Sequence, residues 1–151
     1  MTQPPYLLAL DLGTSSVRAS LYDALGEPVP GAAVAEAQTP RTTPDGGVEL
    51  DADELVERAL RCVEGVLAQA VPRAGGIAGV GVCTFWHSVL GVGGDGRPVT
   101  PILTWADTRS VAQVSELRHR LDERAVHART GCRFHTSYLP ARLLWAATAM
   151  P

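Results

Sequence analysis

The segment from Asp11 to Arg18 reads Asp-Leu-Gly-Thr-Ser-Ser-Val-Arg and lies between two apolar runs, so it predicts a tight turn between two strands. Its three hydroxyl residues are Thr14, Ser15 and Ser16. Such a turn can aim backbone N–H groups and hydroxyls at phosphate oxygens, and Gly13 allows close approach because it lacks a Cβ atom. A carboxylate at Asp11 would hold hydrated Mg²⁺ near the phosphates, and Arg18 would add charge-assisted hydrogen bonds. The alternative is a plain polar hairpin turn, because Gly-Thr-Ser turns are common.

The strands around this turn are indicated by short apolar runs. Tyr6–Leu12 and Val17–Asp23 predict an antiparallel hairpin, Ala32–Ala37 a weak third strand, and Gln38–Gly47 a loop. A further apolar run, Ile77–Cys83, predicts a buried strand.

A second hairpin is predicted around the turn Gly94–Pro98. It would pair Ser88–Gly93 with Val99–Thr104, because the only charged residues between Ala74 and Ala106 are the two in this turn.

Three helices are predicted from apolar spacing. Asp51 and Glu54 resemble a capping box at the start of a helix over Asp51–Val71. Its expected buried face consists of Leu55, Ala59, Cys62, Val66 and Ala70. A second helix is expected over about Thr108–Arg124 and a third over Leu139–Met150, with Pro140 acceptable in the first turn. The second helix would bury Val111, Val114, Leu117 and Leu121.

Composition excludes several classes of protein. With 151 residues and 46% apolar content, the chain is long enough for one compact domain with a core. A net charge of −3 gives no basic field for nucleic acid or an anionic membrane, and no apolar stretch reaches the length of a membrane span. The N-terminus lacks the pattern of a secretory signal. The three cysteines have no metal-ligand spacing and are expected to be free thiols in the cytoplasm; they are Cys62, Cys83 and Cys132.

In this context the Asp11–Arg18 segment resembles the first phosphate loop of the actin-like ATPase superfamily. Three further stretches resemble one branch of it, the FGGY carbohydrate kinases. They are Gly47–Asp51, the run Ile77–Val82 with the loop Thr84–Ser88 and the following hairpin, and Thr130–Gly131 with His135 and Ala141–Trp145. The hairpin ends in Pro-x-x-x-Trp-x-Asp-x-Arg, from Pro101 to Arg109, which is the most specific of these features. The family usually carries Lys where this chain has Arg142.

The resemblance implies an α/β fold of the ribonuclease H-like, actin-like ATPase type. This fold has a mixed sheet with flanking helices, here expected to be incomplete at its C-terminal end. ATP and Mg²⁺ are the implied cofactors, held at Asp11, Gly13, Thr14, Ser15, Ser16 and Arg18, with Asp11 serving the metal. The implied sugar-binding residues are Trp86, His87, Trp105, Asp107 and His135. An aromatic face packs against sugar C–H groups, while His and Asp hydrogen-bond hydroxyls.

Several of these residues have structural alternatives. Asp107 and Arg109 can form an ion pair that ties the hairpin to the next helix, and Trp105 can fill the core. His87 can be a merely exposed loop residue, and His135 can serve only to start a helix. The remaining histidines, His119 and His127, are expected on the surface.

The substrate implied by the resemblance is a sugar or a sugar acid. His87-Ser88, Trp105-Ala106-Asp107 and His135 look most like the gluconate-kinase-like branch, favoured here over xylulokinases and glycerol kinases. The bulky pair Phe85-Trp86 departs from the smaller residues usual in that loop.

The implied reaction is phosphoryl transfer from ATP to a sugar hydroxyl, in which the enzyme positions groups and neutralises charge. In the family, the general base is an Asp beyond the position of Pro151, so no catalytic residue is assigned in this chain. We expect residues 1–151 to be a partial N-terminal domain that is inactive alone, without the rest of the first domain and the adenine-binding domain. The alternatives are a non-catalytic sugar- or partner-binding remnant and a non-kinase actin-like ATPase.

The C-terminal helix suggests self-association. Leu139, Leu143, Ala147 and Met150 recur at the spacing of one helix face. With the family's next elements absent, this face and an unpaired sheet edge would be open to association. We expect the chain either to dimerise there, to bind a missing C-terminal half, or to fold the helix back onto the core.

Overall fold

The computed structural model describes residues 3–70 and 76–150, without the side chain of Ala70. The chain divides into two compact units that alternate along the sequence. Unit 1 consists of Met1–Pro40 and Asp51–Phe85, and unit 2 of Arg41–Leu50 and Trp86–Pro151.

Unit 1 is built on a four-stranded mixed sheet with strand order β3-β2-β1-β6. The strands are β1 (Tyr6–Leu12), β2 (Ser16–Tyr22), β3 (Pro28–Ala37) and β6 (Ile77–Thr84). The pairs β1–β2 and β2–β3 are antiparallel, whereas β1 and β6 are parallel. The predicted first hairpin is confirmed, and the third strand is longer than predicted.

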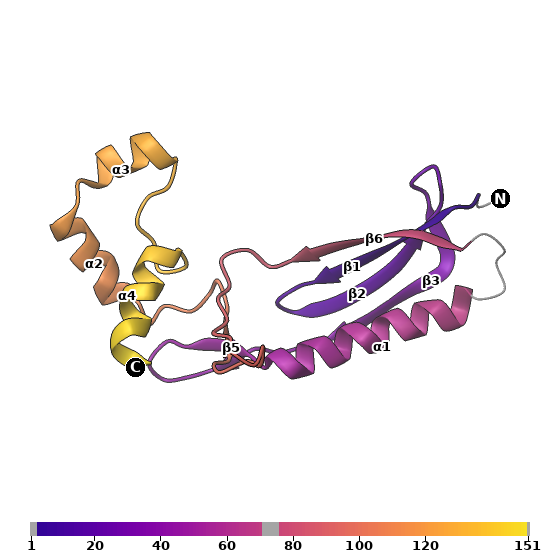
Figure 1. Cartoon of the computed structure of the whole chain (residues 1–151), viewed down its shortest axis with the longest axis horizontal. Coiled ribbons are helices and arrows are strands. Elements are labelled where there is room, and N and C mark those ends of the chain that lie inside the picture. The colour runs from indigo at the N-terminus through magenta and orange to yellow at the C-terminus, as the bar shows by residue number, and fades with distance from the viewer. Residues whose placement is uncertain (1–2, 71–75, 151) are drawn as a thin grey trace. The chain divides into compact units, whose positions relative to one another are not determined.

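Helix α1 (Ala52–Ala70) covers part of this sheet and runs alongside β3 (Figure 1). Its start is confirmed, because Oδ1 of Asp51 accepts hydrogen bonds from the backbone N–H groups of Asp53 and Glu54 at 2.9 and 3.0 Å. The predicted buried face is also confirmed as far as the structure describes it, for Leu55, Ala59, Cys62 and Val66. The predicted end at Val71 lies outside the described residues.

The prediction that Ile77–Cys83 is a buried strand is wrong in one respect. The strand forms as β6, but Val80 and Val82 remain 60% and 59% exposed. The physical reason is that α1 packs mainly on β2 and β3, whereas β6 is the outer strand beside β1. An apolar run favours a strand, but burial requires a second element to cover it.

Unit 2 contains a three-stranded sheet with order β4-β5-β7. Its strands are β4 (Arg41–Thr42), β5 (Val48–Leu50) and β7 (Ile102–Leu103). Strand β4 lies within Gln38–Gly47, where only a loop was predicted.

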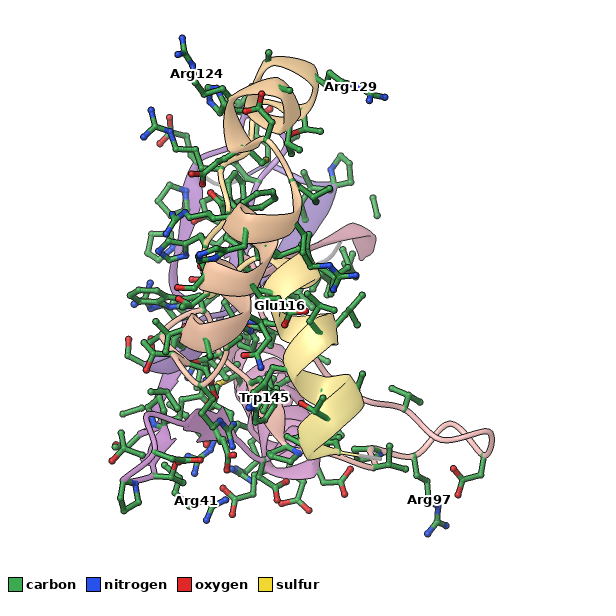
Figure 2. The ribbon with its side chains drawn as sticks, turned by 90° about the vertical axis from the view of Figure 1, so that its left-hand side faces the viewer. Arg41, Arg97, Glu116, Arg124, Arg129 and Trp145 are labelled. Carbon is green, nitrogen blue, oxygen red and sulfur yellow. The ribbon has the colours of Figure 1, made fainter. Side chains whose placement is uncertain are left out.

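The second hairpin is confirmed as an antiparallel arm. It is held by bridges between Val89 and Leu103 and between Val92 and Pro98 rather than by two long strands. The arm extends away from helix α4 (Leu139–Ala149) and carries Arg97 at its tip (Figure 2).

The helix predicted over Thr108–Arg124 is two helices, α2 (Val111–Arg120) and α3 (Glu123–Thr130), so this prediction was wrong. Leu121 is extended, and Oδ1 of Asp122 then accepts hydrogen bonds from the next turn, which starts a new helix. Val111 and Leu121, predicted to be buried, are 63% and 48% exposed. Leu121 lies at the break, where its extended backbone leaves the helical pattern, and Val111 is the first residue of α2.

Helix α4 begins at Leu139 as predicted, with Pro140 in its first turn. It contributes Ala141 to a small core formed with α2 and the preceding segment. That core consists of Val114, Leu117, Phe134 and Ala141. The predicted stripe lies on the exposed side, with Leu139 and Leu143 at 51% and 54% exposure. Self-association through this stripe stays a prediction.

Over residues 3–70 and 76–150, no helix has both the length and the apolar character needed to cross a membrane. All three cysteines are free, and Cys62 is fully buried beneath β2.

We expect Val66→Ala to destabilise unit 1 by about 2 kcal/mol, because Val66 is fully buried and the smaller side chain leaves a cavity. Thiol labelling of Cys62 measures this directly and should become about 30-fold faster, since 1.4 kcal/mol corresponds to a factor of ten. The matched control is Val56→Ala on the same helix, where the side chain is 57% exposed. Equal labelling rates for the two variants would contradict the assigned packing of α1.

Candidate functional site

The candidate phosphate loop is the turn between β1 and β2 in unit 1. The N–H of Gly13 donates to the carbonyl of Ser16 at 2.9 Å and closes the turn. Gln38, which the sequence analysis missed, braces it from the end of β3. Its backbone N–H donates to the carbonyl of Ser15 at 2.9 Å, and its side-chain amide donates to the carbonyl of Gly13. The turn is therefore fixed on both sides.

Gly13 is required by the closeness of this turn. A Cβ atom added there would lie 2.9 Å from the carbonyl oxygen of Ser16, closer than real Cβ contacts come. Ser15 is exposed, and Thr14 and Ser16 are partly exposed. Hydroxyls on a rigid turn match the acceptor oxygens of a phosphate, so the residues present fit a nucleotide phosphate.

Asp11 and Arg18 lie opposite each other on β1 and β2, with Nη1 of Arg18 3.4 Å from Oδ2 of Asp11. Their side chains are 47% and 61% exposed, whereas the neighbouring Val17 is fully buried on the other face of the sheet. A half-exposed carboxylate can hold a hydrated magnesium ion. In the described ranges, no group of three His, Cys, Asp or Glu side chains is arranged to hold a metal.

In unit 2, three of the predicted sugar-binding residues belong to a cluster of rings with Tyr138. The ring centroids of His87 and Tyr138 are 4.7 Å apart, and those of His135 and Tyr138 are 5.5 Å apart. Trp86 meets His87 edge-on at 6.0 Å. Nδ1 of His135 lies 2.6 Å from Oγ of Ser137. The structure thus brings His87 and His135 to the same tyrosine, although 48 residues separate them in the sequence.

The cluster borders a pocket of about 330 Å³ within unit 2. His87, His135 and Tyr138 line it beside a mostly apolar wall. The apolar wall is formed by Leu117, Val126, Phe134, Leu139, Pro140 and Ala141. Sequence reasoning missed Ser137 and Tyr138, and their closeness to His135 in the sequence was the only available signal.

Trp105 is 53% exposed and Trp86 is 79% exposed. The alternative that Trp105 fills the core therefore does not hold. Sugar binding by the two indoles stays a prediction. Asp11 lies in unit 1, whereas both tryptophans lie in unit 2.

Asp107 is buried in an ion-pair network rather than exposed. Nη2 of Arg109 lies 2.6 Å from Oδ2 of Asp107 and 2.8 Å from Oε1 of Glu49, and the N–H of Val48 donates to Asp107 at 3.2 Å. The guanidinium also lies 4.7 Å over the ring of Trp145, which extends from α4 (Figure 2). The ion pair considered from the sequence is therefore present. Sugar binding by Asp107 stays a prediction.

Electrostatics keeps Arg109 charged in this network. Burial disfavours the cation, but the hydrogen bonds and charges of Asp107 and Glu49 outweigh it and raise the pKa of Arg109. Because Arg109 stays charged, its ion pairs with Asp107 and Glu49 hold the end of the hairpin arm in place.

Comparison with known proteins identifies the family. Residues 6–151 match the model of the N-terminal domain of the FGGY family of carbohydrate kinases. The chain belongs to this family. The prediction from the sequence motifs is confirmed, as is the mixed-sheet fold.

The chain is 34% identical over 156 aligned residues to the autoinducer-2 kinase of Salmonella choleraesuis, covering 97% of this chain and 28% of that protein. It is 26% identical to the gluconokinase of Bacillus subtilis, over 93% of this chain and 26% of the relative. The solved structure of Plasmodium falciparum glycerol kinase with ADP has the same fold, with a TM-score of 0.88 and 20% identity over 100% of this chain and 30% of that chain. The chain thus spans between a quarter and a third of the length of these FGGY kinases, and they do not single out the gluconokinase branch.

We expect Asp107→Ala to lower the free energy of unfolding of unit 2 by about 3 kcal/mol, because it removes a carboxylate partner of the buried Arg109. Tryptophan fluorescence during urea unfolding isolates this unit, since Trp86, Trp105 and Trp145 all belong to it. The control is Asp95→Ala in the exposed tip of the hairpin arm, which should cost less than about 0.5 kcal/mol. An unchanged midpoint for Asp107→Ala would show that the network does not stabilise the unit.

Proposed function

We propose that this chain forms the N-terminal part of a kinase that transfers the γ-phosphoryl group of ATP to a hydroxyl of a sugar or sugar acid. The observation that carries the proposal is the family match over residues 6–151. That range includes both the braced turn after Asp11 and the ring cluster around Tyr138. One unit thus carries a candidate phosphate site and the other a candidate acceptor site.

The turn after β1 would hold the phosphates of the nucleotide. Hydroxyls of Thr14, Ser15 and Ser16 would donate to phosphate oxygens, while Arg18 would offset their charge. Asp11 would hold a hydrated magnesium ion, which supplies charge neutralisation on the β- and γ-phosphates when bound. The ADP in the Plasmodium falciparum glycerol kinase structure supports an adenine nucleotide as the second substrate.

The acceptor would bind at the ring cluster. His87 and His135 would hydrogen-bond hydroxyls, and the exposed indoles of Trp86 and Trp105 would pack against sugar C–H groups. Asp107, at the end of the hairpin arm, would also contribute to binding the sugar. Gluconate is our favoured acceptor because three features resemble the gluconate-kinase-like branch. They are the pair His87-Ser88, the Trp-Ala-Asp ending of the hairpin and His135. The autoinducer-2, gluconate and glycerol kinases act, by their names, on different acceptors, so the choice among them is part of the proposal.

We expect Asp11→Asn to weaken binding of Mg²⁺·ADP by about tenfold, because one charge-assisted metal contact contributes on the order of 1.4 kcal/mol. Calorimetric titration of the chain with ADP, with and without Mg²⁺, measures this effect. Asp53→Asn on the exposed first turn of α1 is the control and should bind as the unchanged protein does. Equal affinity of the Asp11 variant and the control would remove the metal role from Asp11.

We expect His87→Ala to weaken gluconate binding at least tenfold and to leave Mg²⁺·ADP binding unchanged, because the ring belongs to the cluster and not to the phosphate loop. His119→Ala on α2 is the control, since that ring is exposed and its Nδ1 lies 2.7 Å from a carbonyl oxygen of its own helix. Equal losses of both ligands in His87→Ala would indicate a folding defect. Undiminished gluconate binding would move the acceptor site away from this cluster.

A further inference from the structure

His87 has an unusual backbone conformation. Its φ angle is +58°, and it is the only non-glycine residue in the described ranges with a positive φ. Histidine tolerates the left-handed region better than most residues, but such a conformation persists only where the surroundings hold it. Strain of this kind is concentrated at ligand sites, and this ring contacts Trp86 and Tyr138 in the cluster.

The side chain of Arg142 binds the backbone of His87 at this position. It is 3% exposed, and its side-chain hydrogen bonds end on backbone carbonyl oxygens. Nη1 donates to His87 and to Leu103, both at 2.8 Å. Nε donates to Thr136 at 3.0 Å, and Nη2 donates to Thr104. One guanidinium therefore joins both sides of the base of the hairpin arm to the segment that leads into α4.

The geometry of these four bonds suits arginine and not lysine. A guanidinium presents five N–H donors in a planar fork, whereas an ammonium presents three from a single nitrogen. A lysine at this position cannot reach all four carbonyls in the same directions. Nη1 donates to the carbonyls of both His87 and Leu103, so we expect the hydrogen bond to His87 to be disturbed in Arg142→Lys.

We propose that Arg142 is a positioning residue for the acceptor site, which fixes the left-handed backbone of His87 so that its ring stands beside Tyr138 to meet a sugar hydroxyl. This inference rests on the proposed function for the part played by the sugar. The positioning of the ring can be tested without any substrate.

The first test uses the 151-residue chain with ¹⁵N-labelled histidine rings, which give four sets of signals for His87, His119, His127 and His135. In Arg142→Lys we expect the ring signals of His87 to move, while those of His119 and His127 stay in place and report an intact fold. The matched control is Arg118→Lys. Arg118 also donates to a backbone carbonyl before α4, since its Nη2 lies 3.3 Å from the carbonyl oxygen of Phe134, a residue outside the hairpin arm. This variant should leave the His87 signals unchanged.

The second test adds gluconate and Mg²⁺·ADP separately. We expect the affinity for gluconate to fall about tenfold in Arg142→Lys, with unchanged affinity for Mg²⁺·ADP. In the unmodified protein, the buried Nε–H signal of Arg142 should shift with gluconate at the same midpoint as the His87 ring signals. This measurement needs no variant, so it decides the matter even if Arg142→Lys does not fold.

The outcomes separate the two proposals. Two outcomes would overturn the positioning role and leave the kinase proposal intact. One is that the His87 ring signals are unchanged in Arg142→Lys. The other is that gluconate shifts the His87 signals in the unmodified protein but not the Nε–H signal of Arg142. If gluconate moves no signal in the unmodified protein, the acceptor proposal fails. The ring signals of the folded Arg142→Lys variant then still decide whether Arg142 positions His87.

Discussion

The buried guanidinium of Arg142 is the interaction on which unit 2 depends. Burial lowers the pKa of this group, because desolvation disfavours the cation and the nearby charge of Arg109 adds to that effect. A buried charge is tolerated only where polar partners replace water, and here they are backbone carbonyls from both sides of the hairpin base and from the segment before α4. The helix, the arm and His87 are therefore held as one assembly.

A second buried arginine explains the division of the chain. Arg109 pairs with Glu49 as well as with Asp107, and the N–H of Val48 donates to the same Asp107. These contacts hold the segment Arg41–Leu50 in unit 2, although the residues on both sides of it belong to unit 1. Backbone pairing of β5 with β7 adds to these ion pairs, so contacts between residues far apart in the sequence decide which unit this segment joins.

Unit 1 is organised by apolar burial instead. Alternation along β2 puts Val17, Ala19 and Leu21 under α1 and leaves Arg18 on the other face, opposite Asp11. The same pattern that builds the core therefore also presents the charged pair. Gln38 then fixes the turn between these strands through two hydrogen bonds. Rigidity of this turn is what a phosphate site requires, since donors that are already ordered cost no further entropy on binding.

The sequence by itself determined the local elements and the family. Short apolar runs set β1 and β2, the Asp51 cap set the start of α1, and the order of the motifs along the chain indicated an FGGY kinase. These features depend on neighbours in the chain or on residue identity alone. Only the tertiary structure decided that β6 stays exposed and that His87 and His135 share Tyr138. It also decided that Asp107 is buried against Arg109, because such features depend on which distant elements come together, and spacing along the chain does not record that.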